Sequence, residues 1–298
     1  MSLIRNSVLS LLLLALLPGQ NLRPYILIAE TEWAVPEIAA ALKAGLQRNN
    51  FQVLGEYQPA RDVDRWVVVI TAPELLAAVG EVGGLTGFAM ALRIGITREA
   101  DLTQITCVNP LYQGNAYFQG DYPLVEEYYT AFYQRLKTAL QDLGIRKWSE
   151  FGSEDGLTAD RLRKYHYMLG MEYFNDVVKL NTLDDFASAV QTVESNESLS
   201  ENVEIIYSIA LAGQELKLYG IALSGDLGED AFLPVIDTGT PRHTAFLPYE
   251  ILISGADVFM LHGRYRIALA FPDLTMMTFG KIMTTPGDIE DLLRQLAR

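Results

Sequence analysis

The sequence has one cysteine and few basic residues, and both shortages exclude classes of protein. Cys107 is the only cysteine, so the chain has neither an intramolecular disulfide nor a Cys-x-x-Cys redox or zinc motif. It lies in the apolar, alternating run Ile105-Thr106-Cys107-Val108, which predicts a buried strand residue rather than a nucleophile. The chain has 23 Lys and Arg against 37 Asp and Glu, a net charge of −14. Such a charge repels phosphate backbones, so we expect no nucleic acid among its partners.

Recognisable catalytic and ligand-binding motifs are missing as well. The three histidines, His166, His243 and His262, lie far apart and form no HxxxH or HExxH pattern. The sequence contains no GxSxG, SxxK, GxGxxG or GxxxxGK[ST] motif. The acidic stretches 153–156 and 225–230 lack the ligand spacing of a calcium loop. We therefore expect no metal and no cofactor, and we assign no catalytic residue.

Long hydrophobic runs are scarce, and the most informative of them lies at the N-terminus. Residues 8–17 form a ten-residue apolar run that follows Arg5 and precedes Pro18-Gly19-Gln20. This layout is typical of a secretory signal, because the run is too short to span a bilayer unaided. We predict that residues 1–22 are a signal peptide or a retained N-terminal anchor, with a buried first helix as the alternative. The protein would then be periplasmic or otherwise extracytoplasmic, with membrane contact only through an uncleaved segment.

The remaining chain is rich enough in apolar residues to fold. Half of its 298 residues are hydrophobic, which suffices for one large domain or two ordinary ones. Hydrophobic periodicity in the first half predicts, in chain order, strand 25–29, helix 34–49, strands 51–57 and 66–71, helix 73–79, strands 90–97 and 102–108, and helix 124–143.

The second half repeats this order of elements. The pattern predicts strand 173–180, helix 184–193, strands 203–211, 215–223, 249–254, 258–261 and 264–271, and helix 286–296. Pro110 and Pro272 close the last strand of each half, since proline cannot continue a hydrogen-bond ladder. We predict an α+β fold of two tandem copies of a curved antiparallel sheet packed by helices. The predicted units are a first domain at 23–147, a linker with a helix at 148–172 and a second domain at 173–298.

Part of the second half carries a family resemblance. It runs through Leu247-Pro248-Tyr249-Glu250-Ile251, then Arg264-Tyr265-Arg266-Ile267-Ala268-Leu269-Ala270-Phe271-Pro272, then Met276-Met277-Thr278-Phe279-Gly280-Lys281-Ile282. This pattern resembles the prokaryotic family named domain of unknown function 302, and residues 51–118 resemble it more faintly. The resemblance implies a bacterial protein built from small α+β domains with a curved antiparallel sheet. It implies no activity.

One group of basic residues predicts a binding site. His262, Arg264 and Arg266 are spaced by two, which would place them on one face of the predicted strand 264–271, with Lys281 nearby. Arginine forks suit carboxylate and phosphate groups, so these four residues are the candidate anion site. The alternative is a solvated sheet face on which the arginines pair with local acids.

The absence of catalytic motifs favours a non-catalytic role. We predict an exported small-ligand-binding or accessory protein that holds a small ligand or a protein partner on a sheet face or between its domains. One alternative is an enzyme that acts on a small anionic substrate through His262, Arg264 and Arg266. The other is a structural protein–protein interaction module that uses exposed sheet edges.

Overall fold

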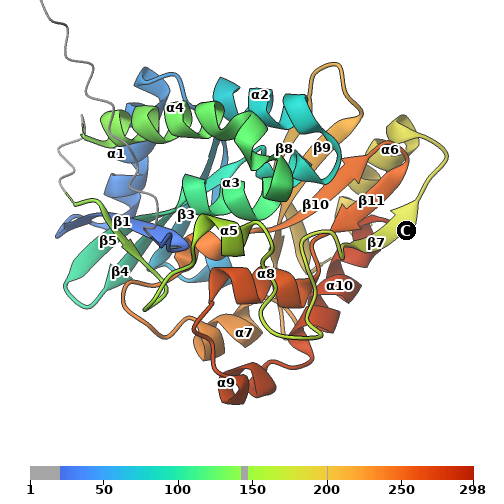
Figure 1. Ribbon diagram of the computed structural model, residues 1–298. Coiled ribbons are helices and arrows are strands. Elements are labelled where there is room, and N and C mark those ends of the chain that lie inside the picture. Colours follow the sequence, from blue (N-terminus) through green and yellow to red (C-terminus); the bar gives the residue numbers. More distant parts are fainter. Residues whose placement is uncertain (1–20, 142–146, 200) are drawn as a thin grey trace, which may run out of the picture.

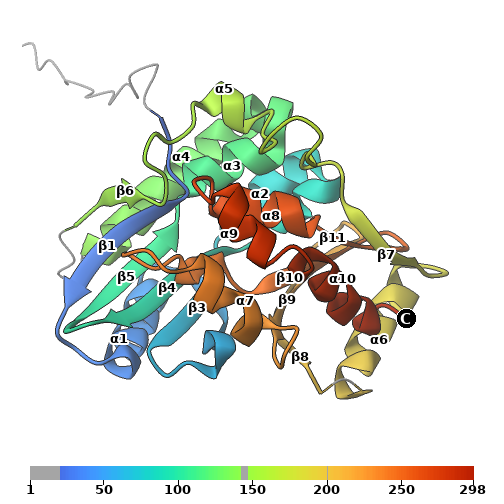
Figure 2. The same ribbon diagram turned by 90° about the horizontal axis from the view of Figure 1, so that it is seen from below.

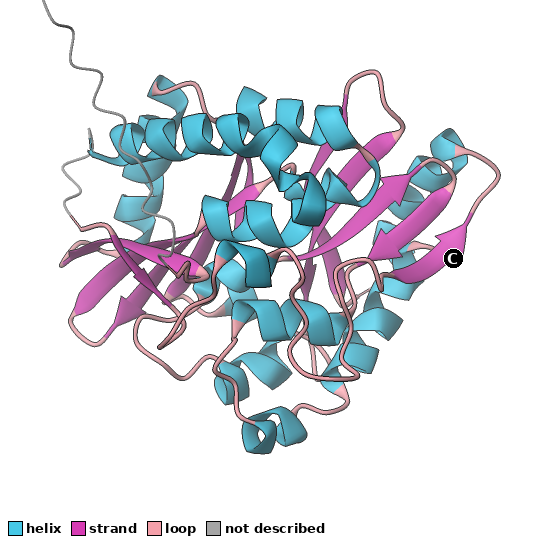
Figure 3. Ribbon diagram, viewed as in Figure 1, coloured by secondary structure: helices cyan, strands magenta, loops and turns pink. Residues whose placement is uncertain are grey.

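Two antiparallel sheets lie side by side in the computed structural model, which describes residues 21–141, 147–199 and 201–298 (Figure 1). Helices α2 (Pro73–Val82) and α4 (Tyr122–Gln141) cover the upper side of the view, and α7 (Glu229–Ile236) and α9 (Met276–Lys281) lie below. Figure 3 shows the strands as two groups with helices packed around them. This architecture confirms the predicted α+β class. Within the described residues, no helix is long and apolar enough to cross a membrane.

The first sheet has the strand order β2-β3-β4-β5-β1-β6. Its strands, in chain order, are β1 (Tyr25–Thr31), β2 (Gln52–Tyr57), β3 (Arg65–Thr71), β4 (Leu92–Glu99), β5 (Leu102–Val108) and β6 (Ser149–Phe151). β6 extends the sheet beyond β1 at its outer edge (Figure 2). All four residues from Val67 to Ile70 are fully buried, because α1 and a segment of the second half cover the two faces of β3.

The second sheet repeats this order. It runs β7-β11-β10-β9-β8, so that β8-β9-β10-β11-β7 matches β2-β3-β4-β5-β1 of the first sheet. The strands are β7 (Val178–Thr182), β8 (Val203–Leu211), β9 (Leu216–Leu223), β10 (Tyr249–Ser254) and β11 (Asp257–Met260). The two sheets therefore share one strand order over five strands each.

The helices bury apolar faces against these sheets and against one another. They are α1 (Val35–Arg48), α2 (Pro73–Val82), α3 (Pro110–Phe118), α4 (Tyr122–Gln141), α5 (Ala159–Leu162), α6 (Phe186–Asn196), α7 (Glu229–Ile236), α8 (Gly263–Ala270), α9 (Met276–Lys281) and α10 (Thr285–Leu296). In α1, Ile38, Leu42 and Leu46 recur at helical spacing and are buried. α1 packs on the first sheet, and α6 and α10 pack on the second.

The structure corrects the prediction for residues 264–271, which form helix α8 and not a strand. His262 caps this helix, because its Nδ1 accepts a hydrogen bond from the Arg264 backbone N–H at 3.2 Å. In the first half, Asn109 is likewise the N-cap of the helix that follows β5, and its side chain accepts a hydrogen bond from Leu111 N–H at 3.1 Å. The run Arg-Tyr-Arg-Ile-Ala-Leu-Ala satisfies a strand alternation, but strand β11 has already ended at Met260.

Two further expectations differ from the structure for related reasons. Pro110 is the first residue of α3, where its missing N–H needs no partner, and Pro272 follows helix α8 and closes no strand. Residues 173–180 are predicted to form one strand, but strand β7 begins only at Val178. Only the last residues of the predicted strand therefore pair with a neighbouring strand. The side chain of Asp176 instead accepts a hydrogen bond from Tyr173 N–H at 2.9 Å and holds a turn.

The two sheets share one hydrophobic core, because each half inserts a short 3₁₀ segment against the sheet of the other. Segment η2 (Gly84–Ala89) packs on β9 and β10, and segment η5 (Thr244–Phe246) packs on β3, β4 and β5. Gly95 marks how close this approach is, since a Cβ there would lie 2.8 Å from the Ala245 backbone nitrogen. The interior between the sheets is therefore built by both halves.

The sheets also meet where β2 crosses β8, and a glycine permits that contact. A Cβ at Gly55 would lie 2.4 Å from the backbone oxygen of Ile206. We expect Gly55→Ala to lower the free energy of unfolding by about 1–3 kcal/mol, because two backbones must move apart. Urea unfolding measures this change. Gly80→Ala is the control, since its Cβ would meet nothing within 4 Å and alanine favours helix α2. Equal stabilities of the two variants would contradict the close approach.

Candidate functional site

A cavity of about 280 Å³ opens beside His243, where three segments of the chain come together. One wall is the loop at Gly152, another is the turn that follows α7, and the third is the segment from the end of α8 to α9. Its lining consists of Gly152, Ile236, Asp237, Thr238, Gly239, His243, Phe271, Asp273, Leu274, Thr275 and Thr278.

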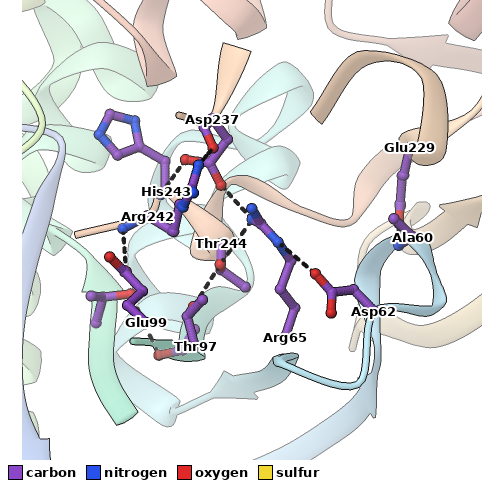
Figure 4. A network of polar contacts seen from close by, with 12 residues as sticks. Ala60, Asp62, Arg65, Thr97, Glu99, Glu229, Asp237, Arg242, His243 and Thr244 are labelled. Carbon is purple, nitrogen blue, oxygen red and sulfur yellow. Dashed lines mark hydrogen bonds and ion pairs between the residues drawn. The ribbon is translucent and has the colours of Figure 1, made fainter. Parts of the chain in front are cut away.

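A buried polar network fixes the backbone of His243 (Figure 4). Its N–H donates to Asp237 Oδ1 at 2.7 Å, and the other oxygen of this buried carboxylate pairs with the guanidinium of Arg65 on β3. The next residue, Thr244, accepts from Arg65 Nη1 at 3.2 Å and shares a 2.6 Å hydrogen bond with Thr97 on β4. The first sheet therefore positions a histidine that belongs to the second half.

The imidazole ring points away from this network and is held in one tautomer (Figure 4). Its Nδ1 lies 3.1 Å from the carbonyl oxygen of Ala270. A carbonyl can only accept, so Nδ1 carries the proton and Nε2 is left as an acceptor. The ring stacks on Phe271 and packs at a tilt against Tyr25, with ring centroids 4.6 Å away in each case. Burial lowers the pKa of His243, so the ring is neutral at pH 7.

The other polar groups of the cavity are a carboxylate and hydroxyls. Asp273 accepts from Ser153 Oγ at 3.1 Å and from the Glu154 backbone N–H at 2.6 Å, which ties the 152–156 loop to the segment after α8. Thr275 caps helix α9 by accepting from Thr278 N–H at 3.2 Å. Among the described residues, no lysine or arginine lines the cavity. The site is thus rich in acceptors, and it suits a ligand that carries O–H or N–H donors.

A second hollow lies on the other side of Asp273. This cleft of about 570 Å³ is lined by charged groups of both signs and by two tyrosines: Asp155, Asp160, Asp273, Arg161, Lys164, His166, Tyr165 and Tyr167. Tyr165 and Tyr167 donate to the carbonyls of Ala268 and Leu274 and so hold the cleft against the end of α8. Its mixed charge selects no single class of ligand.

The four residues of the predicted anion site do not converge. His262 Nε2 lies 3.5 Å and Arg264 Nη1 lies 3.3 Å from the same oxygen of Glu172, near the surface. Arg266 is buried and points into the core between the sheets, and Lys281 is exposed at the end of α9. The reason is the helix, in which residues two apart project about 200° from each other. On the predicted strand they would have shared a face.

No pattern in the sequence predicts the His243 site, because its partners come from distant segments. Asp237 is six positions away, but Arg65 of the first half and Ala270 and Phe271 of the second become neighbours only through tertiary packing. In the described part of the chain, no group of three or more His, Cys, Asp and Glu side chains is arranged to hold a metal ion. Cys107 is buried, as predicted, and burial raises the pKa of its thiol.

Comparisons with known proteins give little further information. No family model matches the sequence. No curated protein matches it either. A solved structure, described as the crystal structure of the uncharacterized conserved protein DUF302 from Bacillus stearothermophilus, is similar to part of the chain. It covers 39% of this chain and 95% of that one at 17% identity, with a TM-score of 0.35. None of the proposals below depends on this similarity.

Proposed function

We propose that this protein is a non-catalytic binding protein that holds a small ligand in the His243 cavity. The observation that carries the proposal is the fixed, neutral imidazole of His243 in the wall of a 280 Å³ cavity, where its Nδ1 is bound to a carbonyl and its Nε2 is left as an acceptor. A polar group held this firmly by packing and a backbone carbonyl is what orients a ligand in a preformed site.

The lining defines the chemistry of this ligand. Nε2 of His243, the carboxylate of Asp273 and the threonine hydroxyls favour a neutral or cationic molecule with several O–H or N–H donors. Phe271 supplies an apolar surface beside them. Ligand sites commonly measure about 300–1,000 Å³. At about 280 Å³ this cavity is slightly below that range, which suits a molecule no larger than a monosaccharide.

Thermal unfolding in the presence of small compounds tests the proposal. We expect at least one of ribose, glucose, myo-inositol and ethanolamine to stabilise the protein, by about 2.7 kcal/mol at a hundredfold excess over its Kd. Acetate and phosphate should not act through this cavity, because no lysine or arginine lines it within the described chain and the His243 ring is neutral.

Two variants locate the binding. His243→Phe keeps the stacked ring but removes the acceptor, and it should abolish the stabilisation. His166→Phe is the matched control, because His166 lines the neighbouring cleft and also packs against an aromatic ring, that of Tyr173. Equal stabilisation of wild type and His243→Phe, or no stabilisation by any of the four compounds, would contradict the proposal.

We also propose that the protein is exported through residues 1–22, of which residues 1–20 lie outside the described part of the structure. The apolar run 8–17 after Arg5 supports this. N-terminal sequencing of the mature protein is the direct test. The tandem organisation is a further proposal, and the shared strand order of the two sheets supports it. Superposition of β1–β5 on β7–β11 tests it, and a failure of these strands to align would contradict it.

A further inference from the structure

We propose that a third cavity, which lies between the first sheet and helices α3 and α8, binds a small monovalent anion. This cavity measures about 30 Å³ and lies next to two buried arginines, Arg93 of β4 and Arg266 of α8. It is separate from the His243 cavity, although Tyr25 contributes to the wall of the one and packs on the histidine of the other. The proposal does not depend on the ligand proposed for His243.

The charges around this cavity do not balance. Arg93 Nη1 lies 2.7 Å from Glu250 Oε1, and Arg266 Nη1 lies 3.2 Å from Glu250 Oε2. All three side chains are at least 96% buried. Among the described residues, no other carboxylate lies within 4.0 Å of either guanidinium. One carboxylate thus serves two buried cations, and burial of an uncompensated charge is costly unless a counter-ion or a hydrogen-bond partner is present.

The buried arginine also keeps hydrogen-bonding capacity that the protein does not use. Nη2 of Arg266 donates to the carbonyls of Phe246 and Pro248 at 2.8 and 2.7 Å. Its Nε has no partner in the described part of the structure. Such an orphaned donor on a buried cation is rare in folded proteins and indicates an unseen partner.

The walls of the cavity supply further donors. Tyr117 Oη accepts from Arg266 Nη1 at 3.4 Å, which leaves its own proton for another acceptor. Burial raises the pKa of Tyr25, so that its phenol stays protonated and remains a donor. Gln113 Nε2 uses one N–H for the carbonyl of Ala91 and keeps a second. Cationic and neutral donors therefore surround the space, as an anion requires.

The volume selects the size of the anion. A cavity volume of about 10–15 Å³ is enough to hold one water molecule. A cavity of about 30 Å³ therefore admits chloride, bromide or formate but excludes sulfate and phosphate. A bound anion would neutralise the arginine that Glu250 leaves uncompensated, and it would link a strand of the first half to a helix of the second.

Unfolding at constant ionic strength tests this inference on the full chain. Replacing sodium gluconate by sodium chloride, bromide or formate should raise the Tm saturably, by about 2–4 °C, because the anion binds only the folded state. Sodium sulfate at equal ionic strength should give no saturable rise. Arg266→Met should lose the chloride response, since it leaves Arg93 and Glu250 as a balanced pair. Arg264→Met, on the exposed side of α8, should keep it.

Bromide diffraction makes the test independent of the variants, in case Arg266→Met does not fold. Crystals of the wild-type protein grown in sodium bromide should show an anomalous peak between Arg93 and Arg266. Bromide peaks confined to the protein surface, or identical Tm values in chloride and gluconate, would overturn the proposal and assign the cavity to water.

Discussion

Replacing Glu250 with alanine is expected to lower the free energy of unfolding by about 3–5 kcal/mol, which is the usual cost of removing one partner from a buried ion pair. The substitution leaves the buried guanidinium groups of Arg93 and Arg266 without a carboxylate partner, and their side chains are each only 4% exposed. It also removes the acceptor of the Tyr207 hydroxyl, which lies 3.1 Å from Oε1. Urea denaturation monitored by circular dichroism measures the loss.

Glu290→Ala is the matched control for this prediction. Glu290 also pairs with an arginine, Arg294, but on the partly exposed surface of α10, where ion pairs contribute about 0–1 kcal/mol. If Glu250→Ala were no more destabilising than Glu290→Ala, the buried cluster would not hold the two halves together.

The second large effect concerns Glu229, the first residue of α7. This carboxyl is 1% exposed, and burial raises its pKa to about 7. It accepts from the Ala60 backbone N–H and from the Tyr57 hydroxyl, each at 2.9 Å, but no lysine or arginine pairs with it in the described chain. Figure 4 shows it reaching the η1 segment (Pro59–Arg61) of the first half.

The raised pKa gives stability a definite dependence on pH. A carboxyl whose pKa is higher in the folded state favours folding fully below its unfolded pKa of 4.5, and this contribution is lost as pH rises through about 7. The difference between these values corresponds to about 3 kcal/mol. Urea unfolding of wild type should therefore lose about 3 kcal/mol relative to Glu229→Gln between pH 4.5 and pH 7.5.

The comparison with the variant isolates this group from other titrations. Burial lowers the pKa of His243, so its protonation destabilises the fold as pH falls below 6.5, the opposite direction. Both Glu229→Gln and wild type contain this histidine, so its effect cancels. Glu204→Gln, at an exposed position of β8, should retain the wild-type pH dependence. If Glu229→Gln showed the same dependence of stability on pH as wild type, the claim that burial raises the pKa of Glu229 would be wrong.

Most of the fold could be predicted from the sequence, because its elements have strong local signals. Alternation and turn residues located β4 and β5, and the helical spacing of Ile38, Leu42 and Leu46 located α1. The prediction failed at α8, where a short run of alternating residues satisfies both periods. Residues 263–270 form a helix because strand β11 has already ended, and this becomes clear only in the tertiary structure. Because these residues form a helix, the four residues of the predicted anion site do not share one face.

The candidate site could not be predicted, for a different physical reason. The carbonyl of Ala270 sets the tautomer of His243, and Tyr25 and Phe271 pack against its ring. Asp237 accepts a hydrogen bond from the His243 backbone N–H. None of these relations has a fixed spacing in the sequence, because they arise from the tertiary packing of separate segments. Arg266, which the sequence did single out, joins a cluster with Glu250 and Arg93 that only the packed structure reveals.

Nitrogen NMR of the histidine side chains tests the binding site most directly. In ¹⁵N-histidine-labelled protein near pH 7, we predict that His243 is neutral with its proton on Nδ1, and that its Nε2 resonance shifts when the stabilising compound among ribose, glucose, myo-inositol and ethanolamine saturates the protein. A His243 that is protonated at this pH, or an Nε2 resonance that does not change at saturation, would contradict the account.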